Sequence, residues 1–143
     1  MTCWFCVTNP ENWMVINKEK VWGVSNLYRR VLNKAKKGDK MVICTIEGDE
    51  KRKKVDPKIY GIFEVESDPC KDCKIIFHSF RQELCPHRVK IKPIKTPEEP
   101  VPIKRFAQNL SFTEKRANQD VPFTRVMMEI PESDFKTIDS SIM

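Results

Sequence analysis

The sequence contains few of the residues from which reactive loops are commonly built. Only four glycines and two histidines occur among its 143 residues. The glycines are not clustered, which excludes the glycine-rich loops that wrap phosphate groups. No apolar run approaches the roughly 18 residues that a membrane-spanning helix needs, and the N-terminus has no signal-peptide pattern. We therefore expect a cytoplasmic protein without a membrane anchor or a nucleotide-binding loop.

The composition is that of a soluble globular domain with a basic surface. Apolar residues make up 40% of the chain and charged residues 32%, which argues against disorder. The length fits a single domain that extends over 1–143. A formal net charge of +6 favours anionic partners, nucleic acid first among them. The high lysine content, together with few glycines, also suits a heat-adapted organism.

Strand and helix signals alternate along the chain. Asn9 can cap a helix that begins at Pro10, which indicates a helix at 9–17. A second helix is expected across 26–36, and residues 21–24 (VWGV) are expected to connect the two. The apolar stripe of that second helix would comprise Leu27, Val31, Leu32 and Ala35.

Apolar and β-branched residues are concentrated in the segments between and after these helices. A last helix is expected after Pro131. Strands are predicted at 2–8, 41–46, 58–67, 87–95 and 121–130. In the third of these, Ile59, Phe63 and Val65 would share one face with Gly61. The order predicts an α+β domain with a curved sheet or partial barrel of mostly antiparallel strands, covered by helices.

Trp22 lies beside Gly23, and this pair is the first candidate for a binding site. A glycine lets the backbone bend tightly and lets a ligand approach closely. Asn12, ten residues upstream, offers both a donor and an acceptor. A tryptophan plane and an amide together can stack a base and hydrogen-bond its edge. The alternative is structural: Trp22 would fill the core and Asn12 would serve as a local cap.

Several segments resemble one family when they are taken in order. They are TCWFCVTNPENW, KVWGVS, KKGDKMVICTI, PKIYGIFEVESDP, HRVKIKPI and IPESDF. Together they cover nearly the whole chain and resemble an EVE domain, a member of the PUA-like superfamily that also contains ASCH and YTH domains. The resemblance implies an open β-barrel of five to six strands flanked by short helices. It also implies recognition of a modified base in DNA or RNA, without catalysis and without a cofactor.

The resemblance places a base pocket around Trp22. Trp22 matches the tryptophan that stacks the base, and Asn12 matches the asparagine at the helix start that bonds its edge. In YTH relatives the loop after the third strand supplies a second wall, but this chain has no tryptophan there. The remaining pocket residues would be Thr8, Asn9, Gly23, Phe77 and Phe80. The other two tryptophans, Trp4 and Trp13, are assigned to the core.

Two basic segments are candidates for contact with phosphates. Arg88, Lys90 and Lys92 alternate with apolar residues and are expected to form one cationic face of a strand. A cluster of cations at 51–54 falls in a loop. Such charges would make nucleic-acid binding salt-dependent. A solvated face without a partner is the alternative for both segments.

The cysteines suggest a competing function. Cys70 and Cys73 have zinc-knuckle spacing, and Cys85 and His87 follow with His78 between the two pairs. The alternative is therefore a structural or protein-interaction domain with a zinc knuckle at 70–87. A disulfide and free thiols remain open for the same residues.

Two further arrangements of cysteine carry less weight. Cys85 could pair with one of the two histidines as a thiolate nucleophile, but no oxyanion site or orienting group accompanies it. The chain is therefore expected not to be an enzyme. Cys3 and Cys6 fall within one predicted strand, so their side chains should face opposite sides and should not share a metal.

Overall fold

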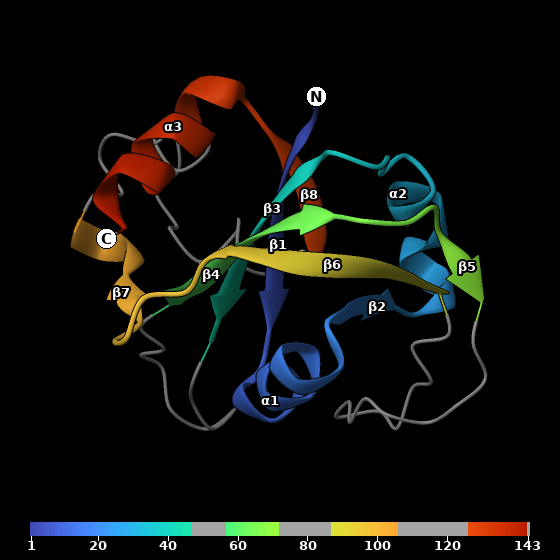
Figure 1. Cartoon of the computed structure of the whole chain (residues 1–143), viewed down its shortest axis with the longest axis horizontal. Helices are drawn as coiled ribbons and strands as arrows, with labels where there is room; N and C mark the ends of the chain where they lie inside the picture. The colour runs from blue at the N-terminus through green and yellow to red at the C-terminus, as the bar shows by residue number, and fades with distance from the viewer. Residues whose placement is uncertain (47–56, 72–86, 106–125, 143) are drawn as a thin grey trace.

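The computed structural model describes residues 1–46, 57–71, 87–105 and 126–142 (Figure 1). The elements in chain order are β1 (Cys3–Thr8), α1 (Pro10–Glu19), β2 (Val21–Val24), the 3-10 helix η1 (Asn26–Tyr28), α2 (Arg29–Leu32), β3 (Lys40–Thr45), β4 (Lys58–Val65), β5 (Cys70–Lys71), β6 (His87–Lys95), β7 (Val101–Pro102), the 3-10 helix η2 (Ile103–Arg105), β8 (Met127–Ile130) and α3 (Glu132–Ser141).

The strands form one curled sheet that makes a half-barrel. Its order is β2-β6-β4-β3-β1-β8, while the short β5 pairs with β6 and the short β7 pairs with β4. The pair β1 and β3 is parallel, and every other described pair is antiparallel. The prediction of an α+β domain with mostly antiparallel strands is therefore confirmed.

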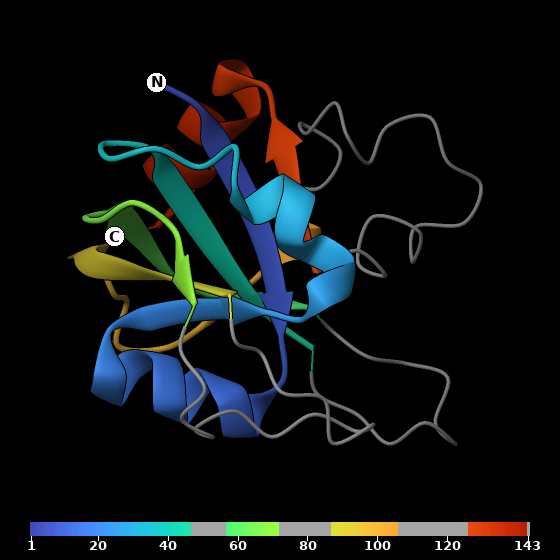
Figure 2. The ribbon, with the colours of Figure 1, turned by 90° about the vertical axis from the view of Figure 1, so that its right-hand side faces the viewer.

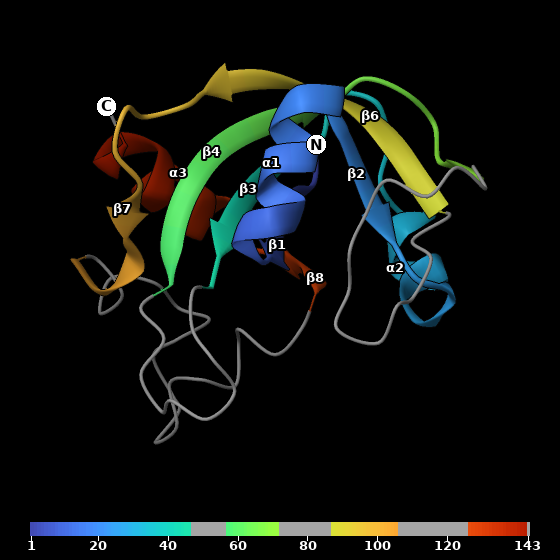
Figure 3. The ribbon, with the colours of Figure 1, turned by 90° about the horizontal axis from the view of Figure 1, so that it is seen from below.

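Two apolar clusters lie on the two faces of this sheet. Alternation along β1 sends Trp4 and Cys6 into an inner cluster, and Cys3 and Phe5 into an outer one. The inner cluster lies beneath α1, β2 and α2, whereas α3 covers the other face (Figures 2 and 3). The prediction that Cys3 and Cys6 face opposite sides is confirmed by this division.

Helix α1 begins as its sequence predicts. The Asn9 side chain accepts a hydrogen bond from the backbone N–H of Asn12 at 2.8 Å, and Pro10 occupies the first turn, where its missing N–H does no harm. The helix ends at Lys20, whose φ of 56° places it in the left-handed region. This end turns the chain directly into β2.

The segment after α1 differs from the prediction. Residues 21–24 are not a connection but strand β2, which pairs with β6. The helix predicted at 26–36 is reduced to η1 and the four residues of α2, and Leu27 is 81% exposed instead of buried. The apolar stripe predicted one long helix, but pairing with β6 fixes Val24, and a shorter segment follows. In it Leu32 and Ala35 are buried, and Val31 is partly buried against the inner cluster.

Strand β4 also departs from the simple alternation. Phe63 and Val65 belong to the inner cluster, but Ile59 belongs to the outer one. The register of β4 shifts against β3 between Ile43 and Cys44, where a bulge adds one residue. One extra residue reverses the face of all residues beyond it, so Ile59 and Phe63 do not share a face as predicted.

Gly61 on β4 leaves no room for a side chain. A Cβ at this position would lie 2.9 Å from a ring carbon of Phe63 and 3.1 Å from the carbonyl oxygen of Lys95. We expect Gly61→Ala to lower the free energy of unfolding by about 1–3 kcal/mol through overpacking. Urea denaturation checks this, with Ser133→Ala on the exposed face of α3 as the control. A change at Gly61 no larger than the control would contradict the close approach.

Candidate nucleic-acid interface

Thr8, Asn9 and Asn12, three of the predicted pocket residues, lie where α1 starts, at one end of the half-barrel. Strands β1 and β3 run in parallel and finish there with Thr8 opposite Thr45. Helix α1 follows β1 directly, and β2 returns beneath it (Figure 3). Thr8, Asn9 and Asn12 are half-buried at this end. The topology therefore brings residues from β1, α1 and β2 to a single region.

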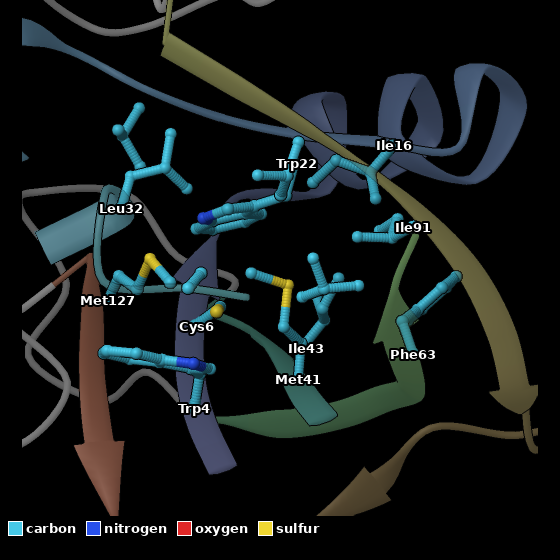
Figure 4. Packing of buried hydrophobic residues seen from close by; sticks show 14 residues of the cluster. Trp4, Cys6, Ile16, Trp22, Leu32, Met41, Ile43, Phe63, Ile91 and Met127 are labelled. Carbon is cyan, nitrogen blue, oxygen red and sulfur yellow. The ribbon is translucent and has the colours of Figure 1, made fainter. Parts of the chain in front are cut away.

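Trp22 lies inside the molecule in this structure. Its side chain is 2% exposed and belongs to the inner cluster, together with Ile16, Leu32 and Ile91 (Figure 4). Helix α1 covers it from one side, and Cys6 of the sheet lies on the other. The indole is thus closed to solvent, and a base can stack on it only after this packing opens.

The polar atom of Trp22 is unusual for a core residue. Among the residues that the structure describes, its Nε1–H meets no hydrogen-bond acceptor. Thr45 is 0% exposed, and its Oγ1 likewise has no hydrogen-bond partner among the described residues. In Trp4, by contrast, Nε1 donates to Asp39 Oδ2 at 3.0 Å. A buried donor without a partner costs about 1–3 kcal/mol, so Trp22 is not optimised for packing alone.

The other described residues of the predicted pocket have distinct local roles. Asn9 uses its side-chain oxygen to cap α1. Asn12 projects from the first turn of α1 and is half-buried. Gly23 has an ordinary extended conformation opposite Arg88, so its backbone does not require glycine.

The three predicted phosphate ligands on β6 do not share an exposed face, and that expectation is wrong for Arg88. Arg88 is 4% exposed, although Lys90 is exposed. The Lys92 Nζ lies 3.0 Å from Glu64 Oε2, and Lys40 bonds the other oxygen of the same carboxylate. Hydrogen bonds from Lys40 and then Lys92 lower the pKa of Glu64, and Glu64 raises the pKa of Lys92. This surface is therefore partly neutralised.

Other predicted site residues lie outside the described part of the chain. They are Phe77, Phe80, Cys73, His78, Cys85 and the cations at 51–54. Of the proposed knuckle, Cys70 and His87 are described. Cys70 is opposite Arg88 and Lys71 is opposite His87 in the β5–β6 ladder, so Cys70 and His87 point to opposite faces. This register disfavours one metal ion bound by both.

The described cysteines offer no reactive centre in the core. Cys3, Cys6, Cys44 and Cys70 are all free thiols. Burial raises the pKa of Cys6 and of Cys44, which keeps both protonated. No group of three metal-binding side chains occurs within the described ranges.

Asp39 and Thr45 are the residues that sequence reasoning missed. Asp39 is 4% exposed, and its carboxylate accepts hydrogen bonds from Trp4 Nε1 and from the backbone N–H groups of Thr2 and Lys36. The sequence did contain a signal for Asp39. It is an acidic residue that directly follows the glycine at the end of a helical segment and directly precedes a buried strand. Thr45 carried no signal, since a threonine at a strand end is ordinary.

None of the helices in the described segments has the length and apolar character to cross a membrane.

Known structures share this fold at low sequence identity. The Mmi1 YTH domain in complex with RNA matches with a TM-score of 0.65 and 16% identity, over 99% of this chain and 80% of that one. Human THYN1, in complex with DNA that contains 5-methylcytosine, matches with a TM-score of 0.63 and 16% identity, over 99% and 97% of the two chains. The expected fold, a curled half-barrel similar to that of a YTH domain, is thereby confirmed.

A sequence relative and a family model agree with the fold. The UPF0310 protein of Pyrococcus horikoshii is 40% identical over 147 aligned positions, which cover 100% of both chains. Its source fits the expectation of a heat-adapted organism. The model of the EVE domain matches residues 2–140. The chain therefore belongs to the EVE domain family.

Proposed function

We propose that this protein binds nucleic acid without catalysis and holds a modified base beneath α1. Trp22 stacks the base, Asn12 hydrogen-bonds its edge, and Thr8 and Gly23 line the opening. The likeness to a YTH domain bound to RNA and to THYN1 bound to methylated DNA supports the class of ligand. The net charge of +6 supports it independently.

The observation that carries the pocket is the buried Trp22 Nε1–H, which has no acceptor among the described residues. If this position served packing alone, an aromatic side chain without a polar atom would fill it without the energetic cost of an unpaired buried N–H. Tryptophan is instead the best stacking surface among the side chains. The unpaired Thr45 Oγ1 adds a second polar group inside the sheet, next to the strand partner Thr8.

Binding requires an opening of the inner cluster, because the indole is 2% exposed in this structure. Helix α1 covers Trp22, and its Ile16 side chain packs against the same cluster. Displacing that cover exposes apolar surface, and the stacked base replaces the lost contacts. The proposal therefore predicts that a modified base enters the pocket more slowly than a nucleic-acid strand binds to the outer surface of the protein.

Asn12→Ala tests the edge contact. We expect it to weaken binding to an oligonucleotide that carries the preferred modified base by about tenfold, the value of one hydrogen bond of about 1.4 kcal/mol. Binding to the unmodified oligonucleotide should change little. Fluorescence anisotropy measures both, using labelled single strands that differ only in one 5-methylcytosine or one N6-methyladenine, as DNA and as RNA.

The matched control is Asn17→Ala, the same substitution on the exposed side of α1. Among the described residues, the Asn17 side chain bonds only Lys20, at the C-terminal end of the helix. It should leave both affinities unchanged. Equal losses for the two variants, or no preference for any modified strand by the unaltered protein, would remove the pocket assignment.

A further inference from the structure

A dense group of positive charges lies on the segment that follows β2. The sequence has no acidic residue between Glu19 and Asp39. Five exposed cations occur there, and we call them the α2 cationic patch: Arg29, Arg30, Lys34, Lys36 and Lys37. None of the five forms an ion pair with a described residue. Their charge is therefore not offset by neighbours in the described part of the chain.

Packing holds these five side chains outward. Leu32 is 0% exposed and Ala35 is 2% exposed, so the apolar side of the segment is fixed against the inner cluster. The backbone N–H of Asn33 bonds the Arg29 carbonyl at 3.0 Å, and that of Ala35 bonds the Leu32 carbonyl at 2.9 Å. The cations are consequently exposed to solvent along a short, hydrogen-bonded segment.

The patch lies beside the proposed base pocket. Leu32 packs in the same cluster as Trp22 (Figure 4), and only four residues, which include η1, separate the end of β2 from the start of α2 (Figure 2). A strand whose base enters beneath α1 would bring its neighbouring phosphates toward this segment. We propose that the α2 cationic patch binds the sugar–phosphate backbone of the nucleic acid; this inference rests on the proposed function.

The chemistry of the patch favours nucleic acid over an anionic membrane. A helix that lies in a membrane surface needs a broad apolar face to insert. Here Leu32 and Ala35 are already buried against the protein, and Leu27 is the one large apolar side chain exposed next to the patch in the described structure. Unpaired guanidinium and ammonium groups suit regularly spaced phosphates. An isolated exposed leucine can in addition contact a sugar or base.

Two double variants test the patch, Arg29→Gln with Arg30→Gln and Lys36→Gln with Lys37→Gln. Each should weaken binding to modified and unmodified single strands by about tenfold at 50 mM salt. Each should also reduce the slope of log K against log salt by about 1.4, since each phosphate contact on a single strand contributes about 0.7. The ratio of the two affinities should stay constant, because phosphate contacts carry no base information.

The control removes two charges at the other end of the molecule. Arg105→Gln with Lys136→Gln changes η2 and α3, which lie away from α2 (Figure 1). Patch variants with the same slope as this control would overturn the inference. Loss of binding to phosphatidylserine vesicles with unchanged binding to oligonucleotides would overturn it as well, in favour of a membrane surface.

The two proposals fail separately. If Asn12→Ala abolishes the preference for a modified base and the patch variants change nothing, the pocket stands and the patch is refuted. If the patch variants lower affinity and the salt slope but no modified base is preferred, the backbone contact stands and the pocket is refuted.

Discussion

Trp22→Ala is expected to lower the free energy of unfolding by about 3–5 kcal/mol, the usual cost of truncating a buried tryptophan. The side chain is 2% exposed and packs against Ile16, Leu32 and Ile91. Its removal leaves a cavity in the middle of the inner cluster. Chemical denaturation with far-UV circular dichroism measures the loss.

The more informative variant is Trp22→Phe, which keeps an aromatic ring and deletes the unpaired donor. Loss of packing is partly offset by removal of a buried N–H without an acceptor, so we expect a loss below about 1.5 kcal/mol. Trp4→Phe is the matched control, since Trp4 is equally buried but its Nε1 bonds Asp39. It should cost about 2–3 kcal/mol, because it removes a hydrogen bond to a charged acceptor.

A smaller loss for Trp4→Phe than for Trp22→Phe would show that the Trp22 donor is satisfied in solution. Binding gives a second comparison. If Trp22 stacks a base, Trp22→Phe should weaken binding to the modified strand more than Trp4→Phe does, although it is the more stable variant. A merely structural role would give the reverse order, with affinity following stability.

Asp39→Ala is expected to lower the free energy of unfolding by about 3–5 kcal/mol, because it leaves a buried indole N–H without a partner and breaks two further bonds. Asp39 Oδ1 accepts from the Thr2 N–H at 3.1 Å, and Oδ2 accepts from Lys36 N–H at 2.9 Å and from Trp4 Nε1 at 3.0 Å. One carboxylate thereby joins the N-terminal strand, the end of the α2 segment and the start of β3. The loss is measured by urea denaturation.

The control is Asp139→Ala, where a carboxylate pairs with Lys95 at 2.8 Å but both side chains are 40% exposed. That loss should not exceed about 1 kcal/mol. A double-mutant cycle with Trp4→Phe isolates the indole contact. Asp39→Ala should cost less in the Trp4→Phe background, and purely additive losses would refute the coupling.

Local patterns predicted most elements but not their register or their faces. Helix α1 was predictable because Asn9 and Pro10 act within one turn. Strands β1 and β3 were predictable from their apolar runs, and β6 was predictable from the alternation of charged and apolar residues. The exposure of Leu27 and the reversal at Ile59 were not predictable, because strand pairing and a bulge decide them, and both depend on residues distant in sequence.

The membership of the candidate site stays a prediction, and the closed state of Trp22 was not predictable from the sequence. An ordered set of motifs singled out Trp22 and Asn12, and the fold brings α1 and β2 together as this requires. Whether Trp22 is open or closed depends on packing from Ile16, Leu32 and the sheet, which no local pattern encodes. The prediction that Arg88 is exposed was wrong for the same reason, since alternation along a strand predicts which face a residue takes but not what covers that face.

By itself, the sequence determined the family, the fold class and the basic character of this protein. Composition, helix caps and motif order are properties of the sequence, and they can be read from it directly. The tertiary structure alone decided which face each strand residue takes. It also decided which cations are unpaired, and that the buried Trp22 N–H has no acceptor, within the part of the chain that the structure describes. These depend on contacts between residues far apart in sequence, and such contacts exist only after the chain has folded.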